Sequence, residues 1–207
     1  MSISGTIKAR CPACGTSHDA ALVQSINARD QPAVVERLLA GDLNVLACEC
    51  GRRTLLEATL LFHDPERAYF CQACPGGEPA MAAGARAFET VAPSLATRRL
   101  VPSHNALLEK VLILRAGLDD STLEVLKVIL LASRGDDLDR VLLFAAVDRE
   151  AGILTWQLPD QQRTLASPLD GYTKLAASRP PSPSPTELRI DRLWAIDAAR
   201  RLTESAS

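Results

Sequence analysis

CPACG at residues 11–15 and CECG at residues 48–51 are the stretches that decide how the N-terminal half of this chain folds. Each carries two cysteines followed by a glycine, which lets the backbone turn tightly at little steric cost. Two such turns can direct four sulfur atoms at one ion, and structural zinc takes four thiolates in a tetrahedron. The sequence therefore predicts a Zn2+ site whose ligands are Cys11, Cys14, Cys48 and Cys50.

A third pair, Cys71 and Cys74, keeps the ligand set open. The second turn has CxC spacing, one residue shorter than CxxC, so chelation by this turn needs a tighter backbone. Cys71 and Cys74 are therefore alternative ligands that would complete the site with Cys11 and Cys14, and His18 is an alternative fourth ligand. Other interpretations give the third pair a buried apolar role, a redox role, or a share in a two-metal cluster.

All six cysteines lie before residue 75, and this asymmetry predicts a metal-bearing N-terminal domain at 1–90 and a cysteine-free region at 91–207. The sequence shows neither a signal-peptide pattern nor an apolar run of the roughly 18 residues that a membrane helix needs. We therefore expect a cytoplasmic protein without membrane contact, in which reduced cysteines serve as metal ligands or redox groups rather than as disulfides.

The charge of the chain argues against a large nucleic-acid interface. A net charge of -2 is unlike the basic balance of a protein that binds nucleic acid over a whole face. Four cations nonetheless flank the cysteine turns, where nucleic-acid-binding zinc ribbons place phosphate contacts: Lys8, Arg10, Arg52 and Arg53. The favoured interpretation is solvated charge, or charge balance for a site in which four thiolates surround Zn2+.

The segment between the two cysteine turns predicts a short helix. In DQPAVVERLLAGD (30–42), Asp30 is a candidate cap, Pro32 suits the first turn and Gly41 suits the end. Three flanking segments are interpreted as strands, at residues 21–28, 43–51 and 54–62. The segment 75–87 is rich in glycine, alanine and proline and is interpreted as a loop.

The cysteine-free region predicts a helical pair followed by a small sheet. Helices are expected at about 104–134, where Ser103 can cap the first and Ser121 with Glu124 forms a capping-box pattern for the second. Further elements are a hairpin at about 140–158, a proline–serine linker at 179–185, and a helix at about 191–202 with Ile190, Leu193, Trp194 and Ala198 facing inward. The predicted fold class is α+β: a zinc-ribbon-like sheet with an inserted helix, then a helical pair, a small C-terminal sheet and a terminal helix.

Six segments carry a family resemblance: CPACG (11–15), QSIN (24–27), ERLLAGDLNVLACECG (36–51), LLFHDPERAYF (60–70), RRLVPSHNALLEKVLILRAGLDDSTLEVLK (98–127) and IDRLWA (190–195). Together they resemble the CpXC domain family of bacterial and archaeal proteins. The resemblance implies a zinc-ribbon-like domain of unknown function, whose two cysteine motifs fall on Cys11–Cys14 and Cys48–Cys50. The chain departs from the family pattern in its CEC second motif and in the additional pair Cys71–Cys74.

His63 and Asp64 are neighbours in LLFHDPER and could be read as an acid–base pair. Adjacent residues of a strand point to opposite faces, so the favoured interpretation is a strand end in which Asp64 caps a turn begun by Pro65. The sequence contains no Walker loop, GxSxG or HExxH pattern.

The pattern favours an interaction or scaffold module, in which zinc stabilises the N-terminal fold and the helical part meets a partner protein. An all-cysteine ligand set leaves no position open for a substrate or water, which supports this interpretation. One alternative is a nucleic-acid-binding zinc-ribbon protein in transcription regulation. The other is an enzyme, either a thiol redox enzyme or a metal-dependent one.

Overall fold

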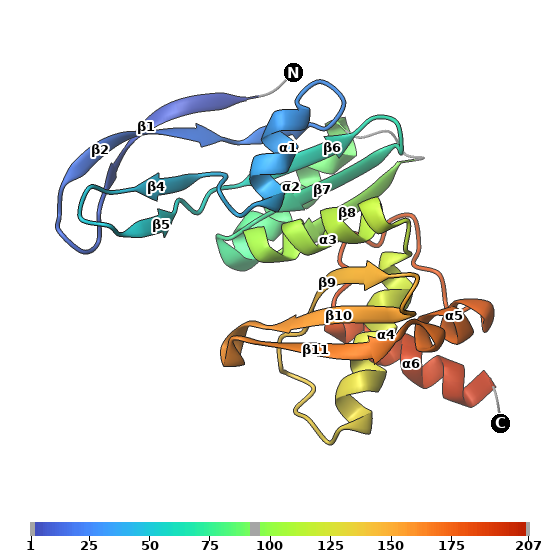
Figure 1. The fold of residues 1–207 in the computed structure, drawn as a ribbon. Coiled ribbons are helices and arrows are strands. Elements are labelled where there is room, and N and C mark those ends of the chain that lie inside the picture. The colour runs from blue at the N-terminus through green and yellow to red at the C-terminus, as the bar shows by residue number, and fades with distance from the viewer. Residues whose placement is uncertain (1–2, 92–95, 206–207) are drawn as a thin grey trace. The chain divides into compact units, whose positions relative to one another are not determined.

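The computed structural model describes residues 3–91 and 96–205, which form an α+β fold (Figure 1). The chain separates into two compact units, Met1–Leu108 and Glu109–Ser207, and the division falls within helix α3 (His104–Ala116). Among the described residues, no helix has the length and apolar character needed to cross a membrane. The domain boundary expected near residue 90 remains a prediction.

Two antiparallel hairpins carry the cysteine turns of the first unit. Strand β1 (Ser4–Arg10) pairs with β2 (Ser17–Val23), and the residues between them form the first turn. Strand β4 (Val45–Ala47) pairs with β5 (Arg53–Leu55), which closes the second turn. The predicted sheet with an inserted helix is therefore built from two separate hairpins.

Helix α1 (Pro32–Leu39) lies in the chain between the two hairpins, as predicted. Pro32 occupies its first turn, where the missing N–H costs no intrahelical bond. Gln31 is the N-cap residue, so the expectation that Asp30 caps the helix is wrong. Asp30 instead accepts a hydrogen bond from the side chain of Asn27, with 2.8 Å between Nδ2 and Oδ2.

A four-stranded sheet forms the core of the first unit. Its strand order is β3 (Ser25–Asn27), β6 (Leu60–Asp64), β7 (Tyr69–Ala73) and β8 (Thr97–Val101). The inner pair β6–β7 is antiparallel, whereas both outer pairs are parallel. The segment 54–62, expected to be one strand, is divided between β5 and β6 because the two strands belong to different sheets.

Helix α2 (Gly77–Val91) replaces the loop expected at 75–87, so that expectation is wrong. A Cβ atom placed on Gly84 would lie 2.9 Å from Nε2 of Gln72 and 3.1 Å from Sγ of Cys74. Glycine lets the helix backbone approach these side chains of the sheet without displacing them. The glycine-rich composition therefore marks a tight helix–sheet contact rather than a loop.

Asn44 joins the two cysteine-bearing hairpins. It is buried with φ of 55°, a left-handed conformation that asparagine tolerates. Its Oδ1 accepts from the backbone N–H of Val23 and its Nδ2 donates to the carbonyl of Val23, each at 2.8 Å. Because Val23 ends β2 and Asn44 directly precedes β4, one carboxamide fixes the two hairpins relative to each other.

Asn44→Ala is expected to lower the free energy of unfolding of the first unit by about 2 to 4 kcal/mol, because both backbone groups of Val23 lose their partner. Urea denaturation followed by circular dichroism measures this loss. Asn105→Ala is the matched control, since Asn105 is exposed on α3 and its replacement is expected to change stability by less than about 0.5 kcal/mol. Equal effects of the two substitutions would contradict the role given to Asn44.

The second unit contains the part of α3 from Glu109 onward and the other predicted elements, which are a second helix, a small sheet and a terminal helix. Helix α4 (Asp120–Ser133) follows α3, and strands β9 (Leu143–Asp148), β10 (Ile153–Leu158) and β11 (Arg163–Pro168) form one antiparallel sheet with β10 in the centre. Helix α5 (Leu169–Ala177) and strand β11 were not expected. The proline–serine segment 179–185 has neither helix nor strand.

The predicted N-terminal cap of α3 is confirmed, whereas the predicted cap of α4 is wrong. Ser103 caps α3, since its Oγ accepts from the N–H of Ala106 at 3.2 Å. Asp119, rather than Ser121, caps α4 by accepting from the N–H of Thr122 at 2.7 Å. Glu124 is therefore free of the expected capping box and lies inside the unit.

Helix α6 (Arg192–Ser205) packs on α4 through small residues. Ala195 and Ala198 are buried against Val125 and Val128. Leu193, which was expected to face inward, is 70% exposed. Ile190 and Ala198 are buried and Trp194 packs against this cluster, so the predicted inward face is confirmed at these three positions and is wrong only at Leu193.

Five charged side chains form a buried network in the second unit. Nζ of Lys110 lies 3.0 Å from Oε1 of Glu124 and 3.1 Å from Oδ2 of Asp120. Nζ of Lys127 lies 2.7 Å from Oε1 of Glu109 and 3.0 Å from that of Glu124. Burial raises the pKa of Glu109, and the ammonium of Lys127 opposes the shift. Each charge therefore depends on its neighbours for compensation.

Lys110→Met is expected to lower the free energy of unfolding by about 3 to 5 kcal/mol, because two buried carboxylates lose a cation. Lys174→Met is the matched control: Lys174 pairs with Asp170 on the surface, where solvent screens the pair, so little change is expected. Thermal and urea denaturation of both variants measure the difference. Wild-type stability of Lys110→Met would show that the network contributes nothing to folding.

Candidate metal centre

The two cysteine turns close in related ways despite their different spacing. In the first turn the N–H of Gly15 donates to the carbonyl of Cys11 at 2.9 Å, and in the second the N–H of Gly51 donates to the carbonyl of Cys48 at 2.9 Å. Both glycines have positive φ, 76° and 85°, which an L side chain adopts at a cost. The shorter CxC turn is thus accommodated by a tighter backbone bond that spans one residue fewer.

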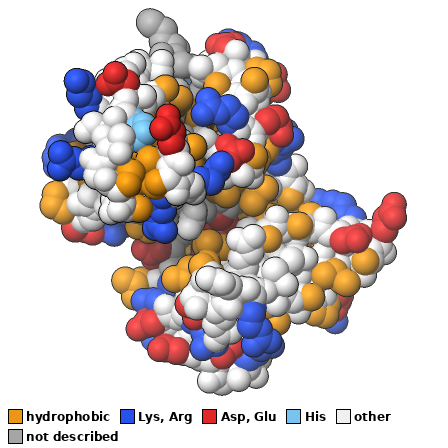
Figure 2. Space-filling view, turned by 60° about the vertical axis from the view of Figure 1, so that its left-hand side comes forward, with side chains coloured by type: hydrophobic (Ala, Val, Ile, Leu, Met, Phe, Trp, Pro, Cys, Tyr) orange, Lys and Arg blue, Asp and Glu red, His pale blue; other side chains and the backbone are white. Residues whose placement is uncertain are grey.

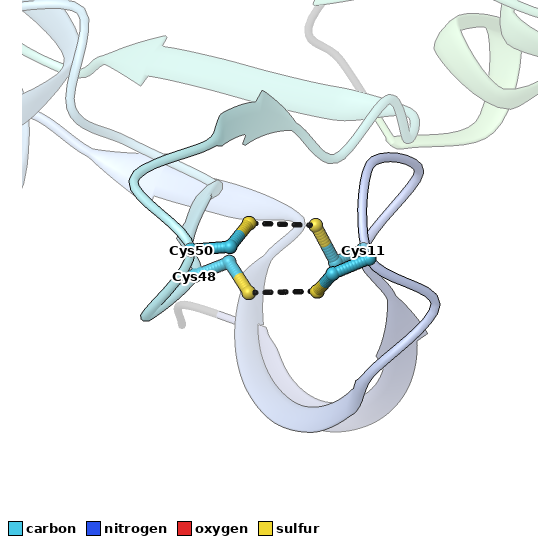
Figure 3. A group of neighbouring side chains, drawn as sticks. Cys11, Cys48 and Cys50 are labelled. Atoms are coloured by element: carbon cyan, nitrogen blue, oxygen red, sulfur yellow. Dashed lines mark hydrogen bonds between the residues drawn. The ribbon is translucent and has the colours of Figure 1, made fainter.

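Four sulfur atoms converge from these turns (Figure 3). The Sγ atoms of Cys11 and Cys50 lie 3.7 Å apart, and those of Cys14 and Cys48 lie 3.5 Å apart. All four atoms lie within 4.8 Å of one another. A tetrahedron with Zn–S bonds near 2.3 Å has edges of about 3.8 Å, so the four cysteines could hold a metal ion without a large rearrangement.

The electrostatics of the cluster favour some thiolates and oppose others. The N–H of Cys14 lowers the pKa of Cys11, and the side chain and backbone of Thr16 lower the pKa of Cys14 to about 6. Although the N–H of Cys50 acts to lower the pKa of Cys48, burial and the neighbouring thiols raise it to about 12. Four thiolates therefore coexist at neutral pH only beside a cation, which metal binding supplies with release of protons.

Two side chains outside the four cysteines contact the sulfur atoms. Nε2 of His18 lies 3.2 Å from Sγ of Cys48, so His18 is a hydrogen-bonding neighbour of a sulfur atom and lies outside the four-cysteine group. Oγ1 of Thr16 lies 3.3 Å from Sγ of Cys14. Thr16 was not among the expected site residues, although a hydroxyl two residues after a cysteine is a signal that can be read in the sequence. Such contacts orient the sulfur ligands of a metal.

Cys71 and Cys74 are buried elsewhere in the first unit. Cys71 lies in β7 and Cys74 directly follows the strand, where Nε2 of Gln72 lies 3.4 Å from its Sγ. Burial raises the pKa of Cys74. Within residues 3–91 and 96–205, the one group of potential metal ligands contains neither cysteine, so the structure does not place this pair beside Cys11 and Cys14.

His63 and Asp64 do not form an acid–base pair. Oδ1 of Asp64 accepts from the backbone N–H groups of Glu66 at 3.0 Å and Arg67 at 3.2 Å, which is a turn cap of the expected kind. The imidazole of His63 stacks on Phe70, with ring centroids 4.1 Å apart. The two side chains leave the strand on opposite faces and act separately.

The protein is thus of a class in which two hairpin turns bring four cysteines together at a site that could hold a metal ion. A comparison with protein-family models matches residues 9–127, more than half of the 207 residues, to the family described as CpXC protein. The chain belongs to the CpXC family, and the predicted resemblance is confirmed. Searches of curated proteins and of solved structures give no match.

Alkylation is expected to distinguish the exposed Cys14 from the buried pair Cys71 and Cys74. After removal of metal by a strong chelator, Cys14 is expected to react first at neutral pH, because its side chain is exposed and its pKa is lowered to about 6. Cys71 and Cys74 are expected to react last, since both are fully buried. Iodoacetamide labelling followed by peptide mass spectrometry measures the order. Early labelling of Cys74 would contradict the placement of this pair in the sheet.

Proposed function

We propose that the four cysteines bind one Zn2+ as a structural site and that the zinc-stabilised unit serves as an interaction or scaffold module for a partner protein. The observation that carries the proposal is the convergence of four Sγ atoms within 4.8 Å, at separations close to the edges of a Zn–S tetrahedron. Soft thiolate ligands in tetrahedral geometry favour zinc over the hard cations magnesium and calcium.

A structural role for the metal follows from the completeness of the ligand set. Four thiolates occupy all positions of a tetrahedron, so no position remains for a water or a substrate. Thiol redox chemistry has weaker support at Cys71 and Cys74, because both thiols are buried and the pKa of Cys74 is raised. These properties favour a binding module over a metal-dependent or thiol redox enzyme.

A cytoplasmic location is part of the proposal. None of the six cysteines is paired in a disulfide, and a reducing compartment keeps such thiols available for metal. A protein partner is favoured over nucleic acid because the cations beside the turns are few. Arg53 forms an ion pair with Asp42, which leaves Lys8, Arg10 and Arg52 as the cations near the two turns that could meet phosphate.

Metal content of purified protein tests the proposal. Wild-type protein is expected to contain one zinc per chain, and Cys48→Ser is expected to lose it because three sulfur atoms and a hydroxyl hold zinc poorly. Elemental analysis by mass spectrometry, combined with counting of free thiols, measures both quantities.

Cys71→Ser is the matched control, since it replaces a cysteine outside the four-cysteine group and is expected to retain zinc. Loss of zinc in Cys71→Ser with retention in Cys48→Ser would overturn the ligand set. If the zinc-loaded protein bound duplex DNA with an affinity that falls as salt rises, the proposed partner would be nucleic acid rather than a protein.

A further inference from the structure

The outer edge of β1 is an unpaired strand edge. Strand β1 pairs with β2 along its whole length, from Ser4 opposite Val23 to Arg10 opposite Ser17. In the described part of the chain no strand pairs with its other side, since β1 and β2 form a two-stranded sheet (Figure 1). Such an edge is a template on which another extended chain can pair.

The register shows which backbone groups of β1 face outward. At the two ends of the hairpin, the N–H of Gln24 donates to the carbonyl of Ile3 and the N–H of Cys11 donates to the carbonyl of Thr16. Hydrogen-bonded and non-hydrogen-bonded pairs alternate along an antiparallel ladder. The odd-numbered residues of β1 therefore bond to β2, and the even-numbered residues direct N–H and C=O outward. These are Ser4, Thr6, Lys8 and Arg10.

The side chains of β1 present two faces of different character. Alternation along the strand places Lys8 and Arg10 on one face and Ile3 and Ile7 on the other. Ile3 is 59% and Ile7 is 38% exposed, so the second face offers apolar surface to solvent. Figure 2, in which the left-hand side of Figure 1 comes forward, shows hydrophobic, basic and acidic side chains interspersed on this face of the chain.

We propose that the outer edge of β1 binds an extended peptide segment of a partner protein, in which acidic residues alternate with apolar ones, as an added third strand. The backbone of the peptide would pair with the outward groups of Thr6 and Lys8. Its acidic side chains would lie beside Lys8 and Arg10, and its apolar side chains beside Ile7. The inference rests on the proposed function as an interaction module and names its surface and partner.

The charge of β1 selects this occupant over a second copy of the chain. Pairing of two β1 strands would bring two copies of Lys8 and of Arg10 onto one four-stranded sheet, where Asp19, which stands opposite Lys8, would offset only part of the added positive charge. Nucleic acid would use the cations but would leave the outward amide and carbonyl groups without strand-like partners. An acidic, alternating peptide satisfies the charges, the apolar face and the backbone at once.

The edge is also held ready for binding. Terminal hydrogen bonds fix β1 at Ile3 and at Cys11, and the cysteine turn at its end belongs to the candidate metal centre. A strand that is ordered before association loses little conformational entropy when a peptide pairs with it. The hairpin therefore needs no rearrangement to accept a third strand.

Backbone pairing is tested with a fluorescein-labelled peptide of alternating aspartate and valine residues, about as long as β1, and full-length zinc-loaded protein. Wild type is expected to give a saturable rise in fluorescence anisotropy. Thr6→Pro removes an outward N–H without touching the ladder to β2 and is expected to weaken binding about tenfold, which corresponds to about 1.4 kcal/mol. Thr6→Ala keeps the N–H and is expected to lose much less of the binding than Thr6→Pro.

Two further readouts separate strand addition from loose electrostatic attraction. Peptide binding is expected to slow hydrogen exchange at the amides of Thr6 and Lys8, measured by NMR. Lys8→Glu is expected to weaken the aspartate–valine peptide and to strengthen a lysine–valine peptide of equal length.

Three results would overturn the proposal. They are no saturable binding of the peptide to wild type, an equal loss of affinity in Thr6→Ala and Thr6→Pro, or equal affinity of wild type for the aspartate–valine and lysine–valine peptides. Self-association through β1, or displacement of the peptide by duplex DNA, would assign the edge to another occupant. Metal content is measured on the same samples. If the purified protein contains no zinc but binds the peptide, the proposed structural zinc site is wrong. If the protein contains zinc but does not bind the peptide, only the proposed peptide binding at the edge of β1 is wrong.

Discussion

The mutual repulsion of four closely spaced cysteine sulfurs is the constraint on which the first unit depends. Although the N–H of Cys50 acts to lower it, burial and the neighbouring thiols raise the pKa of Cys48 to about 12, so the four sulfurs do not all ionise at neutral pH without a cation. A divalent ion coordinated by all four sulfurs would link the two hairpins, which bury little surface of their own. All of β1 except the half-buried Ala9 is exposed, so packing alone gives this strand little support. The carboxamide of Asn44 is the second link that holds the hairpins together.

The cysteine cluster could be predicted from the sequence because a turn that directs two sulfurs inward is a local property. Spacing and a following glycine define each turn, and Gly15 and Gly51 both adopt positive φ. The sequence could not decide between Cys48–Cys50 and Cys71–Cys74 as the second pair, because that choice depends on how distant strands assemble. Cys71 lies in the central antiparallel pair of a four-stranded sheet, and no local pattern reports that placement.

The elements that were missed depend on contacts between distant segments. The composition of 75–87 resembles a loop, yet helix α2 forms there because Gly84 allows a close approach to Gln72 and Cys74. Glu124 and Lys127 were visible as charges within an apolar helix, but their partners Glu109 and Lys110 lie on the preceding helix. A charge inside an apolar run is thus a signal for a buried network, and its partners become known only from the packing of the two helices.

The buried network also bears on how the family-matched region relates to the rest of the chain. All five of its charged side chains fall within residues 9–127, and Lys127 is the last residue matched. Two backbone groups that complete the network lie beyond that limit: Glu109 accepts from the N–H of Phe144, and Lys110 donates to the carbonyl of Ile190 at 3.4 Å. Buried charges need every such partner, because an unsatisfied one is costly. Strand β9 and the segment before α6 therefore supply hydrogen-bond partners to charged side chains of the family-matched region. The residues after 127 thus complete the buried network of that region.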